Sequence, residues 1–469
     1  MPIPVISVSQ MREWEGASWA AGRTEPEVIR RVGVIIAKRS LELTRPLDRI
    51  LIVAGKGHNG EDAREALQHL QEREVHLLNV TDADGAMEDL DAHLAQRPAL
   101  IIDGLFGIGI NRLLSAPWEK LIERLNQAAV PILTVDVPSG LNAESGQPEG
   151  VAIRATITIT LAAPKSGLLK ASAIPFVGRL EVASEIGLVA CPHKSELVWI
   201  SPEDFTGFPP VRQVNAHKGK FGHLVIIAGS LGYHGAAVLA ARGALRACPG
   251  LVTVLTPENV YLPVAAQLQT AMVNSWKRRR EPSENCTAIL FGPGLAADDL
   301  PEELKDEVCY FWTNSSLPVV ADASALNWLP PGPCRASTLR VVTPHPGEAA
   351  RMLQSSTSVI QDDRVAAVRR LSERFGNCLV VLKGHQTLVG RSSGEISVNS
   401  SGNPFLAQGG SGDVLAGYLS GLLAQPALQA NPVLAIRYAV WQHGAAADQL
   451  VKRQASFSVD ELLPGLGRA

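Results

Sequence analysis

Short runs of apolar and β-branched residues alternate with helical periodicity along the first half of the chain. The apolar runs predict strands at 50–54, 75–80, 100–102, 132–135 and 157–161. The spacing between them predicts helices such as 61–72 and 118–129. Strands that alternate with helices in this way are typical of a doubly wound α/β sheet.

The pattern changes at 198–214, where Pro, Gly and polar residues stand without periodicity. We therefore expect two domains, 1–205 and 206–469. The second half restarts the alternation, with strands at 223–228, 251–255, 288–291, 318–320, 340–342 and 378–382 and an alanine-rich helix at 236–247. The second domain is therefore also predicted to be α/β.

Composition and charge narrow the class of protein. The 469 residues are 46% hydrophobic with a net charge of −3, which allows two large cores and predicts neither nucleic acid nor a membrane surface as a partner. No stretch reaches the ~18 apolar residues of a membrane span, and the N-terminus does not resemble a signal peptide. Six widely spaced cysteines without a C-x-x-C pair favour buried, reduced thiols in a cytoplasmic protein.

Three glycine-rich turns follow predicted strands of the first domain. Gly55–Gly60 reads G-x-G-x-x-G between a strand and a helix, which favours dinucleotide binding, although a close-packed βα turn gives the same pattern. Asp103–Gly109 and Asp136–Gly140 follow two later strands. We expect all three turns at the carboxyl edge of one sheet, with Asp103 and Asp136 facing one crevice. Two acids there could hold a cation or move a proton.

The segments GKGHNGED, DGLFGIG, VDVPSGLNAESG and TLAAPKSGLL resemble the NAD(P)H-hydrate epimerase domain (the YjeF N-terminal family) over roughly residues 5–190. The resemblance implies a Rossmann-like doubly wound sheet, a potassium ion at Asn59, Asp103 and Ser139, and proton transfer by Asp136. It also implies contacts to the hydrated dinucleotide from His58, Asn59, Gly60, Glu61, Asp62, Gly107, Ile108 and Gly109.

The chain departs from this family's pattern at Glu61, where glycine is usual, and at Ile108, where threonine is common. A glutamate side chain in that turn would repel a dinucleotide phosphate unless it points away. A first domain that only binds, or only scaffolds, therefore stays open beside an active epimerase. His58 and Glu61 are the residues that keep this alternative open.

A second glycine cluster lies in the segment GNPFLAQGGSGDVLAGYLSGLL, residues 402–423. Its main-chain amides would converge at the start of a helix, where partial positive charge favours an anion. Asp413 follows where a phosphate and a hydroxyl could both reach it, and the helix dipole should keep it ionised. Gly417 and Gly421 predict a flat helix face for close packing. The alternative is an ordinary glycine-rich loop before a core helix.

Motifs at residues 215–465 resemble, in order, the ADP/ATP-dependent NAD(P)H-hydrate dehydratase family, which has a ribokinase-like α/β fold. They include GSLGYHGAA, FGPGL, TPHPGE, LKG and GGSGD. Departures are Ser324, where a second aspartate is usual, and His385 and Gln386, where smaller residues are usual. The resemblance implies that Glu348 helps to hold Mg²⁺ and that Asp413 is the catalytic base. It also implies contacts to hydrate and nucleotide from Ala236, Gly294, His345, Lys383, Gly384, His385, Gln386, Thr387, Gly410, Ser411 and Gly412.

Together the two resemblances imply a bifunctional repair enzyme for hydrated NAD(P)H. The first domain would interconvert the R and S epimers. In the second, Asp413 would take the proton from the C6 hydroxyl of the S epimer, and ADP (or ATP) would phosphorylate that oxygen. Loss of phosphate would then restore the double bond and leave NAD(P)H and phosphate, with AMP as the nucleotide product from ADP. Phosphate leaves more easily than hydroxide, which explains the use of a nucleotide.

Three other interpretations remain. The chain could be a dehydratase whose first domain is a non-catalytic dinucleotide-binding module, or a ribokinase-like small-molecule kinase. Gly55–Gly60 alone would fit an NAD-dependent oxidoreductase, which leaves the second half unexplained. A homo-oligomer is expected, because relatives of the second domain often assemble. The choices between ADP and ATP and between the NADH and NADPH hydrates stay open.

Overall fold

The computed structural model describes residues 2–278, 285–335 and 338–468. The chain forms two compact units, Ile3–Glu196 and Leu197–Ala469. The division falls before the expected boundary at 205/206, because β8 (Leu197–Ile200) pairs in parallel with β17 (Ile396–Asn399) of the second unit. Beyond β8, the Phe205 ring packs against Tyr438 with centroids 5.4 Å apart. The segment rich in Pro and Gly is therefore an irregular part of the second unit.

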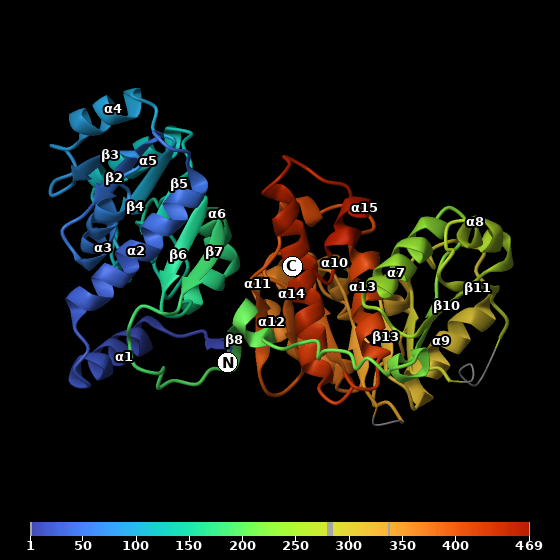
Figure 1. Cartoon of the computed structure of the whole chain (residues 1–469). Helices are drawn as coiled ribbons and strands as arrows, with labels where there is room; N and C mark the ends of the chain where they lie inside the picture. Colours follow the sequence, from blue (N-terminus) through green and yellow to red (C-terminus); the bar gives the residue numbers. More distant parts are fainter. Residues whose placement is uncertain (1, 279–284, 336–337, 469) are drawn as a thin grey trace. The chain divides into compact units, whose positions relative to one another are not determined.

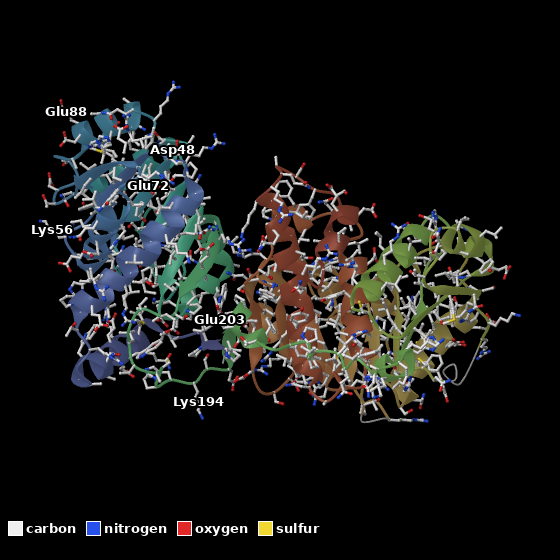
Figure 2. All side chains as sticks on the ribbon, in the orientation of Figure 1. Asp48, Lys56, Glu72, Glu88, Lys194 and Glu203 are labelled. Atoms are coloured by element: carbon white, nitrogen blue, oxygen red, sulfur yellow. The ribbon has the colours of Figure 1, made fainter. Side chains whose placement is uncertain are left out.

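The first unit contains a six-stranded parallel sheet in the order β3-β2-β4-β5-β6-β7. Figure 1 shows α2 lying across one face of this sheet, and Figure 2 shows charged side chains such as Glu72 and Glu88 at the surface. Its elements are β1 (Ile3–Pro4), α1 (Val8–Ala20), α2 (Glu25–Leu43), β2 (Arg49–Ala54), α3 (His58–Ala66), β3 (Glu74–Asn79), α4 (Met87–Ala95), β4 (Leu100–Gly104), α5 (Ala116–Gln127), β5 (Ile132–Val135), β6 (Ile157–Leu161), α6 (Ile174–Val177) and β7 (Arg179–Ala183).

Helices cover both faces of this sheet, and the alternation along β2 shows why. Ile50 and Ile52 belong to the cluster that buries α1, α2 and α3, whereas Leu51 and Val53 belong to the cluster that buries α4 and α5. Successive side chains of a strand point to opposite faces, so an unbroken apolar run fits a sheet covered on both sides. The predicted doubly wound α/β fold is confirmed. The helix expected at 61–72 is instead α3, which starts earlier at His58, followed by a 3₁₀ turn at Leu67–His69.

The second unit has a mainly parallel sheet in the order β8-β17-β16-β15-β14-β13-β12-β9-β10-β11, with β16 antiparallel to both of its neighbours. Its other elements are β9 (His223–Ile227), α7 (His234–Arg246), β10 (Leu251–Thr256), α8 (Tyr261–Ala265), β11 (Met272–Ser275), β12 (Ala288–Phe291), α9 (Glu302–Asn314), β13 (Val319–Ala321), β14 (Arg340–Val342), α10 (Pro346–Met352), α11 (Thr357–Asp362), α12 (Arg364–Arg374), β15 (Leu379–Leu382), β16 (Leu388–Gly390), α13 (Ser411–Leu423), α14 (Pro432–Val451) and α15 (Val459–Leu462).

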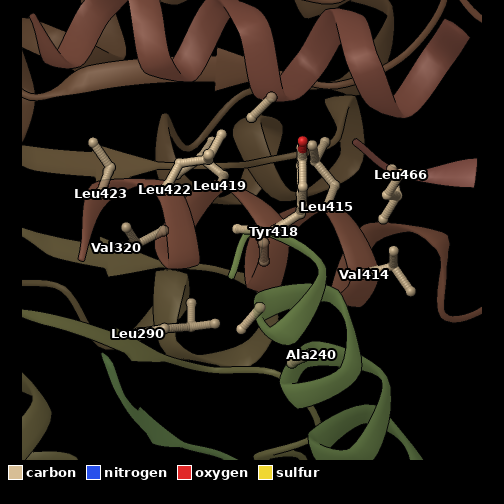
Figure 3. Close-up of a cluster of buried hydrophobic side chains, with 14 of the residues drawn as sticks. Ala240, Leu290, Val320, Val414, Leu415, Tyr418, Leu419, Leu422, Leu423 and Leu466 are labelled. Carbon is tan, nitrogen blue, oxygen red and sulfur yellow. The ribbon is translucent and has the colours of Figure 1, made fainter. Parts of the chain in front are cut away.

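Helix α13 packs closely against α7, as its glycines predict. A Cβ added at Gly417 would lie 1.9 Å from the carbonyl oxygen of Ala240, so no larger residue fits there. Figure 3 shows apolar side chains of α13, including Leu419, beside Leu290 and Val320 of the sheet. This packing fixes the start of α13, and with it the Gly409–Asp413 turn.

Two features bear on the expectations from composition. Within the described residues, no helix is both long and apolar enough to cross a bilayer. All six cysteines are free, but only Cys286 and Cys378 are buried, whereas Cys248 is exposed. The prediction of buried thiols is therefore wrong for the other four positions, because wide spacing along a sequence carries no information on depth.

Candidate active sites

The three glycine-rich turns of the first unit meet at one edge of its sheet, as predicted. They follow β2, β4 and β5, which are neighbours and run parallel, so that their carboxyl ends lie side by side. A Cβ added at Gly60 would lie 2.1 Å from the carbonyl oxygen of Gly55, so the first turn requires glycine. Helix α3 begins at His58, inside this motif, and its first amides can therefore face an anion.

Asp103 joins two of these turns. Its Oδ1 accepts a hydrogen bond from the Ser139 hydroxyl at 2.6 Å, and its Oδ2 accepts one from the Ser139 amide at 3.0 Å. Thr134 and Leu105 also donate to this carboxylate, at 3.0 and 3.2 Å. Burial raises the pKa of Asp103, while the bonds from Ser139 oppose that rise. Asp103 does not face a crevice with Asp136 as expected, because it is fully buried and Ser139, Thr134 and Leu105 occupy its carboxylate.

Oxygen-bearing groups of the predicted potassium ligands lie close together. The Asn59 side chain donates to the carbonyl oxygen of Phe106 at 2.9 Å, and the Ser139 hydroxyl accepts from the Phe106 amide at 2.9 Å. Amide, hydroxyl and carbonyl oxygens suit a hard cation, so these residues fit potassium. Phe106 is a candidate ligand that the sequence did not indicate. Within the described residues, no cluster of three or more His, Cys, Asp or Glu side chains could hold a metal ion.

The residues that depart from the family pattern lie on the first turn of α3 and in the loop after β4. Glu61 is exposed on the first turn of α3, and Nδ1 of the neighbouring His58 lies 2.7 Å from Oε1 of Glu25. Ile108 packs against the apolar core, whereas Gly109 is exposed. A Cβ added at Gly107 would contact Asn59 at 3.4 Å, so this loop lies directly beside Asn59.

Asp136 lies against a lysine that the sequence did not single out as a site residue. Nζ of Lys165 is 2.6 Å from Oδ1 of Asp136, and the Lys165 side chain is fully buried. The motif A-P-K-S-G contains this lysine, but nothing in the spacing shows that its side chain returns to the end of β5. The pair places one charged carboxylate and one ammonium group beside the glycine-rich turns.

Two further carboxyl groups surround this pair. Burial raises the pKa of Asp62 well above its ordinary value, and the carboxylates of Asp136, Glu61 and Glu15 raise it further. Burial also raises the pKa of Glu15 on α1, where Lys165 opposes the rise. Glu15 is a member of the site that sequence reasoning missed, because α1 lies far from the glycine-rich turns in the chain. The first unit thus contains titratable groups of contrasting environment around Asp136.

The turn before α13 has the geometry of an anion cradle. Gly410 caps the helix with φ = +94°, a left-handed conformation that favours glycine. The first-turn amides of Gly412 and Asp413 have no acceptor within the helix, because helix starts leave them unpaired. The Ser411 amide differs from the prediction, since it donates to the carbonyl oxygen of Gln408 at 3.3 Å. An anion bound at this turn would therefore have to share the Ser411 amide with the Gln408 carbonyl.

His443 on α14 contacts the main chain of this cradle. Its Nε2 donates to the Ser411 carbonyl at 3.1 Å, and burial lowers its pKa to about 4. The ring is therefore neutral at pH 7. This contact places α14 against the start of α13, and the hydrogen bond fixes the orientation of Ser411.

Asp413 lies in a charged network. Burial raises its pKa to about 7, with Asp322 adding to the rise and Lys383 opposing it. The expectation that the helix dipole keeps this carboxyl fully ionised is wrong at neutral pH, because burial and nearby carboxylates outweigh the dipole. A carboxyl group with a pKa near the working pH is well matched to general base catalysis.

Lys383 connects Asp322 to the cradle. Its Nζ lies 2.8 Å from Oδ1 of Asp322 and 3.8 Å from Oε2 of Glu348, and a Cβ added at Gly412 would be 3.3 Å from it. Burial alone would lower the pKa of Lys383, but the carboxylates of Asp322 and Glu348 outweigh burial and raise it. The ammonium group is therefore charged and lies where an anion on the cradle would meet it.

His345 and Glu348 form a capping box at the start of α10. Nδ1 of His345 accepts from the Gly347 and Glu348 amides, and Oε2 of Glu348 accepts from the His345 amide at 2.7 Å. The His345 side chain is half exposed, whereas that of Glu348 is 9% exposed. Mg²⁺ binds through one or two carboxylates plus phosphate oxygens and water, so the buried Glu348 beside Asp322 fits such an ion.

The remaining predicted residues border the same end of the sheet. A Cβ added at Gly294 would lie 2.9 Å from that of Ala236, so these two positions adjoin. In the loop Lys383–Thr387, Gly384 and His385 are exposed and the Thr387 hydroxyl donates to the Gly384 carbonyl at 3.0 Å. Arg364 fastens the loop by donating to the carbonyls of His385 and Gln386. Arg364 is another residue that the sequence did not indicate.

The second unit is thus a ribokinase-like α/β domain with an anion cradle at a helix start, and the first is a doubly wound domain with a dinucleotide-type turn. The family model for NAD(P)H-hydrate dehydratase matches residues 224–463, and the model for the YjeF-related protein N-terminus matches residues 76–167. A Bacillus subtilis ADP/ATP-dependent NAD(P)H-hydrate dehydratase, co-crystallised with ATP/Mg²⁺, is 32% identical with a TM-score of 0.50, over 55% of this chain and 92% of that one.

Curated relatives extend over both units. The bifunctional NAD(P)H-hydrate repair enzyme Nnr of Coxiella burnetii is 34% identical over 94% of this chain and 93% of its own length. The enzyme of the same name from Vibrio cholerae is 37% identical over 81% of this chain and 77% of its own. The chain therefore belongs to the family of bifunctional NAD(P)H-hydrate repair enzymes.

Proposed function

We propose that this chain repairs hydrated NADH and NADPH by two reactions, one in each unit. The first unit interconverts the R and S epimers of the hydrate. The second dehydrates the S epimer, consuming ADP or ATP. The observation that carries the proposal is the placement of Asp413, with its pKa of about 7, at a glycine cradle beside the charged Lys383.

In the second unit, Asp413 accepts the proton of the C6 hydroxyl while that oxygen attacks the terminal phosphoryl group. The Gly412 amide and Lys383 stabilise the negative charge that grows on the phosphoryl oxygens. Mg²⁺ bound near Glu348 would neutralise phosphate charge. Asp413 then releases this proton to solvent. When phosphate leaves C6, the neighbouring ring carbon C5 loses a proton, and the ring double bond is restored.

The hydrate and the nucleotide would occupy neighbouring surfaces of this site. Ala236, Gly294 and His345 line the side proposed for the hydrate, and Lys383–Thr387 the side proposed for the adenine nucleotide. Gly294 supports this because it is buried directly against Ala236, so the two positions proposed for the hydrate adjoin.

In the first unit, Asp136 is the proposed proton-transfer residue. Asn59, Ser139 and the Phe106 carbonyl would hold potassium, with Asp103 behind them fixing the Ser139 hydroxyl. The ion would in turn fix the turns that contact the dinucleotide. Glu61 is exposed, so solvent screens its charge, and the residue is compatible with epimerase activity. The proposal includes homo-oligomeric assembly in the cytoplasm, and the small net charge of −3 supports small molecules rather than nucleic acid as partners.

Two single substitutions test the division of labour. Asp413→Asn should abolish dehydration and leave epimerisation at the wild-type rate, and Asp136→Asn should do the reverse. Each rate is measured on separated epimers in the full-length chain. If Asp413→Asn retained dehydration, or if one substitution abolished both reactions, the proposed assignment of one reaction to each unit would be overturned.

A further inference from the structure

We propose that Lys165 is a positioning residue for epimerisation, which presents one oxygen of Asp136 to the substrate. The inference rests on the epimerase activity proposed above and adds a residue and an atom to it. It starts from the location of Lys165, whose side chain is 0% exposed beside the glycine-rich turns. A buried ammonium group is costly unless it is paired and fully hydrogen-bonded, so its presence needs a reason beyond packing.

The ammonium group of Lys165 has an acceptor for each of its three hydrogens. Nζ lies 2.6 Å from Oδ1 of Asp136, 2.8 Å from the Leu161 carbonyl and 3.2 Å from the Thr160 hydroxyl. The main chain at Lys165 is itself anchored, because Ile6 forms a parallel bridge with it and accepts from the Ser166 amide at 2.9 Å. The lysine is therefore held in one position at both ends.

The donors to Asp136 all converge on a single oxygen. Oδ1 accepts from Lys165, from the Thr160 hydroxyl at 3.2 Å and from the Leu161 amide at 3.1 Å. Among the described residues, no donor reaches Oδ2. The carboxylate thus has one oxygen fixed by the protein and one left to accept a proton from the substrate. This asymmetry is the geometry that a positioned base requires.

The main chain at Asp136 is strained in the same arrangement. Asp136 has φ = +62°, a left-handed conformation uncommon for residues other than glycine, and its amide donates to the Ile159 carbonyl at 2.8 Å. Such conformations cost about 1–3 kcal/mol and persist only where the surroundings hold them. Thr160, near the end of the neighbouring β6, and Lys165, just beyond that strand, supply the restraint.

The charges around Asp136 are mostly negative. Asp62 on α3 and Glu15 on α1 interact electrostatically with Asp136, and Glu61 and Glu25 lie near those two carboxyl groups. His58 on α3 and Lys165 supply the opposing positive charge, and His58 is already paired with Glu25. Lys165 is therefore the cation in direct contact with the Asp136 carboxylate in a mainly acidic setting.

The test uses full-length Lys165→Met and Lys165→Arg, with exposed Lys194→Met as the matched control; Figure 2 shows Lys194 at the surface. Lys165→Met should slow conversion of the R to the S hydrate of NADH by at least about 100-fold at neutral pH. The acidic limb of its kcat/KM profile should move up by about one pH unit or more, because the counter-charge is lost. Lys165→Arg should recover part of the rate and return the limb toward the wild-type position. Lys194→Met should behave as wild type.

A second variant covers the case in which Lys165→Met fails to fold. Thr160→Val keeps both charges and removes the hydroxyl that joins them, so it should lower the rate about 3- to 10-fold with the acidic limb unchanged. The proposal is overturned if folded Lys165→Met keeps the wild-type rate, or if it loses rate with an unshifted limb. If Lys165→Met is unfolded, a wild-type rate in Thr160→Val overturns it alone. A wild-type chain that does not accelerate epimerisation at all would instead refute the proposed function.

Discussion

Nζ of Lys383 lies 2.8 Å from Oδ1 of Asp322, so a buried carboxylate fixes the lysine that stands beside the anion cradle. Asp322 is itself fixed, because the Thr343 hydroxyl donates to the same oxygen at 2.6 Å. Asp322 directly follows β13, where it could simply end the strand. Its contacts instead make it a candidate for orienting Lys383 and for setting the proton affinity of Asp413.

Asp322→Asn should therefore change both nucleotide binding and the pH profile of dehydration. Lys383 loses its ion pair, so KM for ADP or ATP should rise about 10-fold. The loss of a negative charge near Asp413 should move the acidic limb of kcat/KM to lower pH. Steady-state kinetics on the S hydrate measure both the KM for the nucleotide and the pH profile, with the exposed variant Asp306→Asn as control. A wild-type KM with an unshifted limb would show that Asp322 only ends the strand.

The wild-type pH profile of dehydration should report Asp413 itself. Its pKa is raised to about 7, first by burial and then by Asp322, and only the ionised form can accept a proton. We expect kcat/KM to rise with pH below about 7 and to level off above it. In Asp413→Asn, a residual rate should lack this limb. A wild-type profile that is flat down to pH ~5 would contradict the assignment.

Asp62→Asn should stabilise the first unit at neutral pH. Because burial raises the pKa of folded Asp62, the native state keeps a proton that the unfolded chain releases, and stability falls as pH rises from the unfolded pKa of about 3.9 through the folded value. The amide avoids this loss. Hydrogen exchange of peptides from α3 and β4 should therefore be slower in the variant at pH 7 and equal to wild type near pH 4. Equal exchange at both pH values would rule out a proton held by native Asp62.

Glu61→Gln should lower KM for the hydrate in epimerisation without changing kcat. Glu61 is exposed at the start of α3, where its negative charge opposes a dinucleotide phosphate. The difference should shrink as salt rises, because an exposed charge is screened. Glu61→Gly should also leave epimerisation unchanged or raise it, and exposed Glu72→Gln is the control. A sharp loss of activity in Glu61→Gln would show that the carboxylate is itself functional.

Local patterns predicted most of the central strands and the two glycine-rich sites. Apolar runs such as 132–135 match strands because the sheet is buried on both faces. Gly410 marks a main-chain position with positive φ, and Gly417 marks a position where two helices pack closely. The sequence could not place Lys165 on Asp136 or Glu15 near Asp62, because those contacts join elements far apart in the chain. It also misjudged Asp413, since a helix start is visible in a sequence but the depth of burial and the neighbouring Asp322 are not.

Recovery of the reduced-nicotinamide absorbance from mixed epimers of hydrated NADH tests the central claim most directly. With full-length protein, ADP or ATP and Mg²⁺, we predict complete recovery at a rate that exceeds spontaneous epimerisation. Recovery of the S fraction alone, with the R fraction lagging at its spontaneous rate, would contradict catalysis by the first unit. No recovery, with the nucleotide consumed by an unrelated alcohol, would contradict the account as a whole.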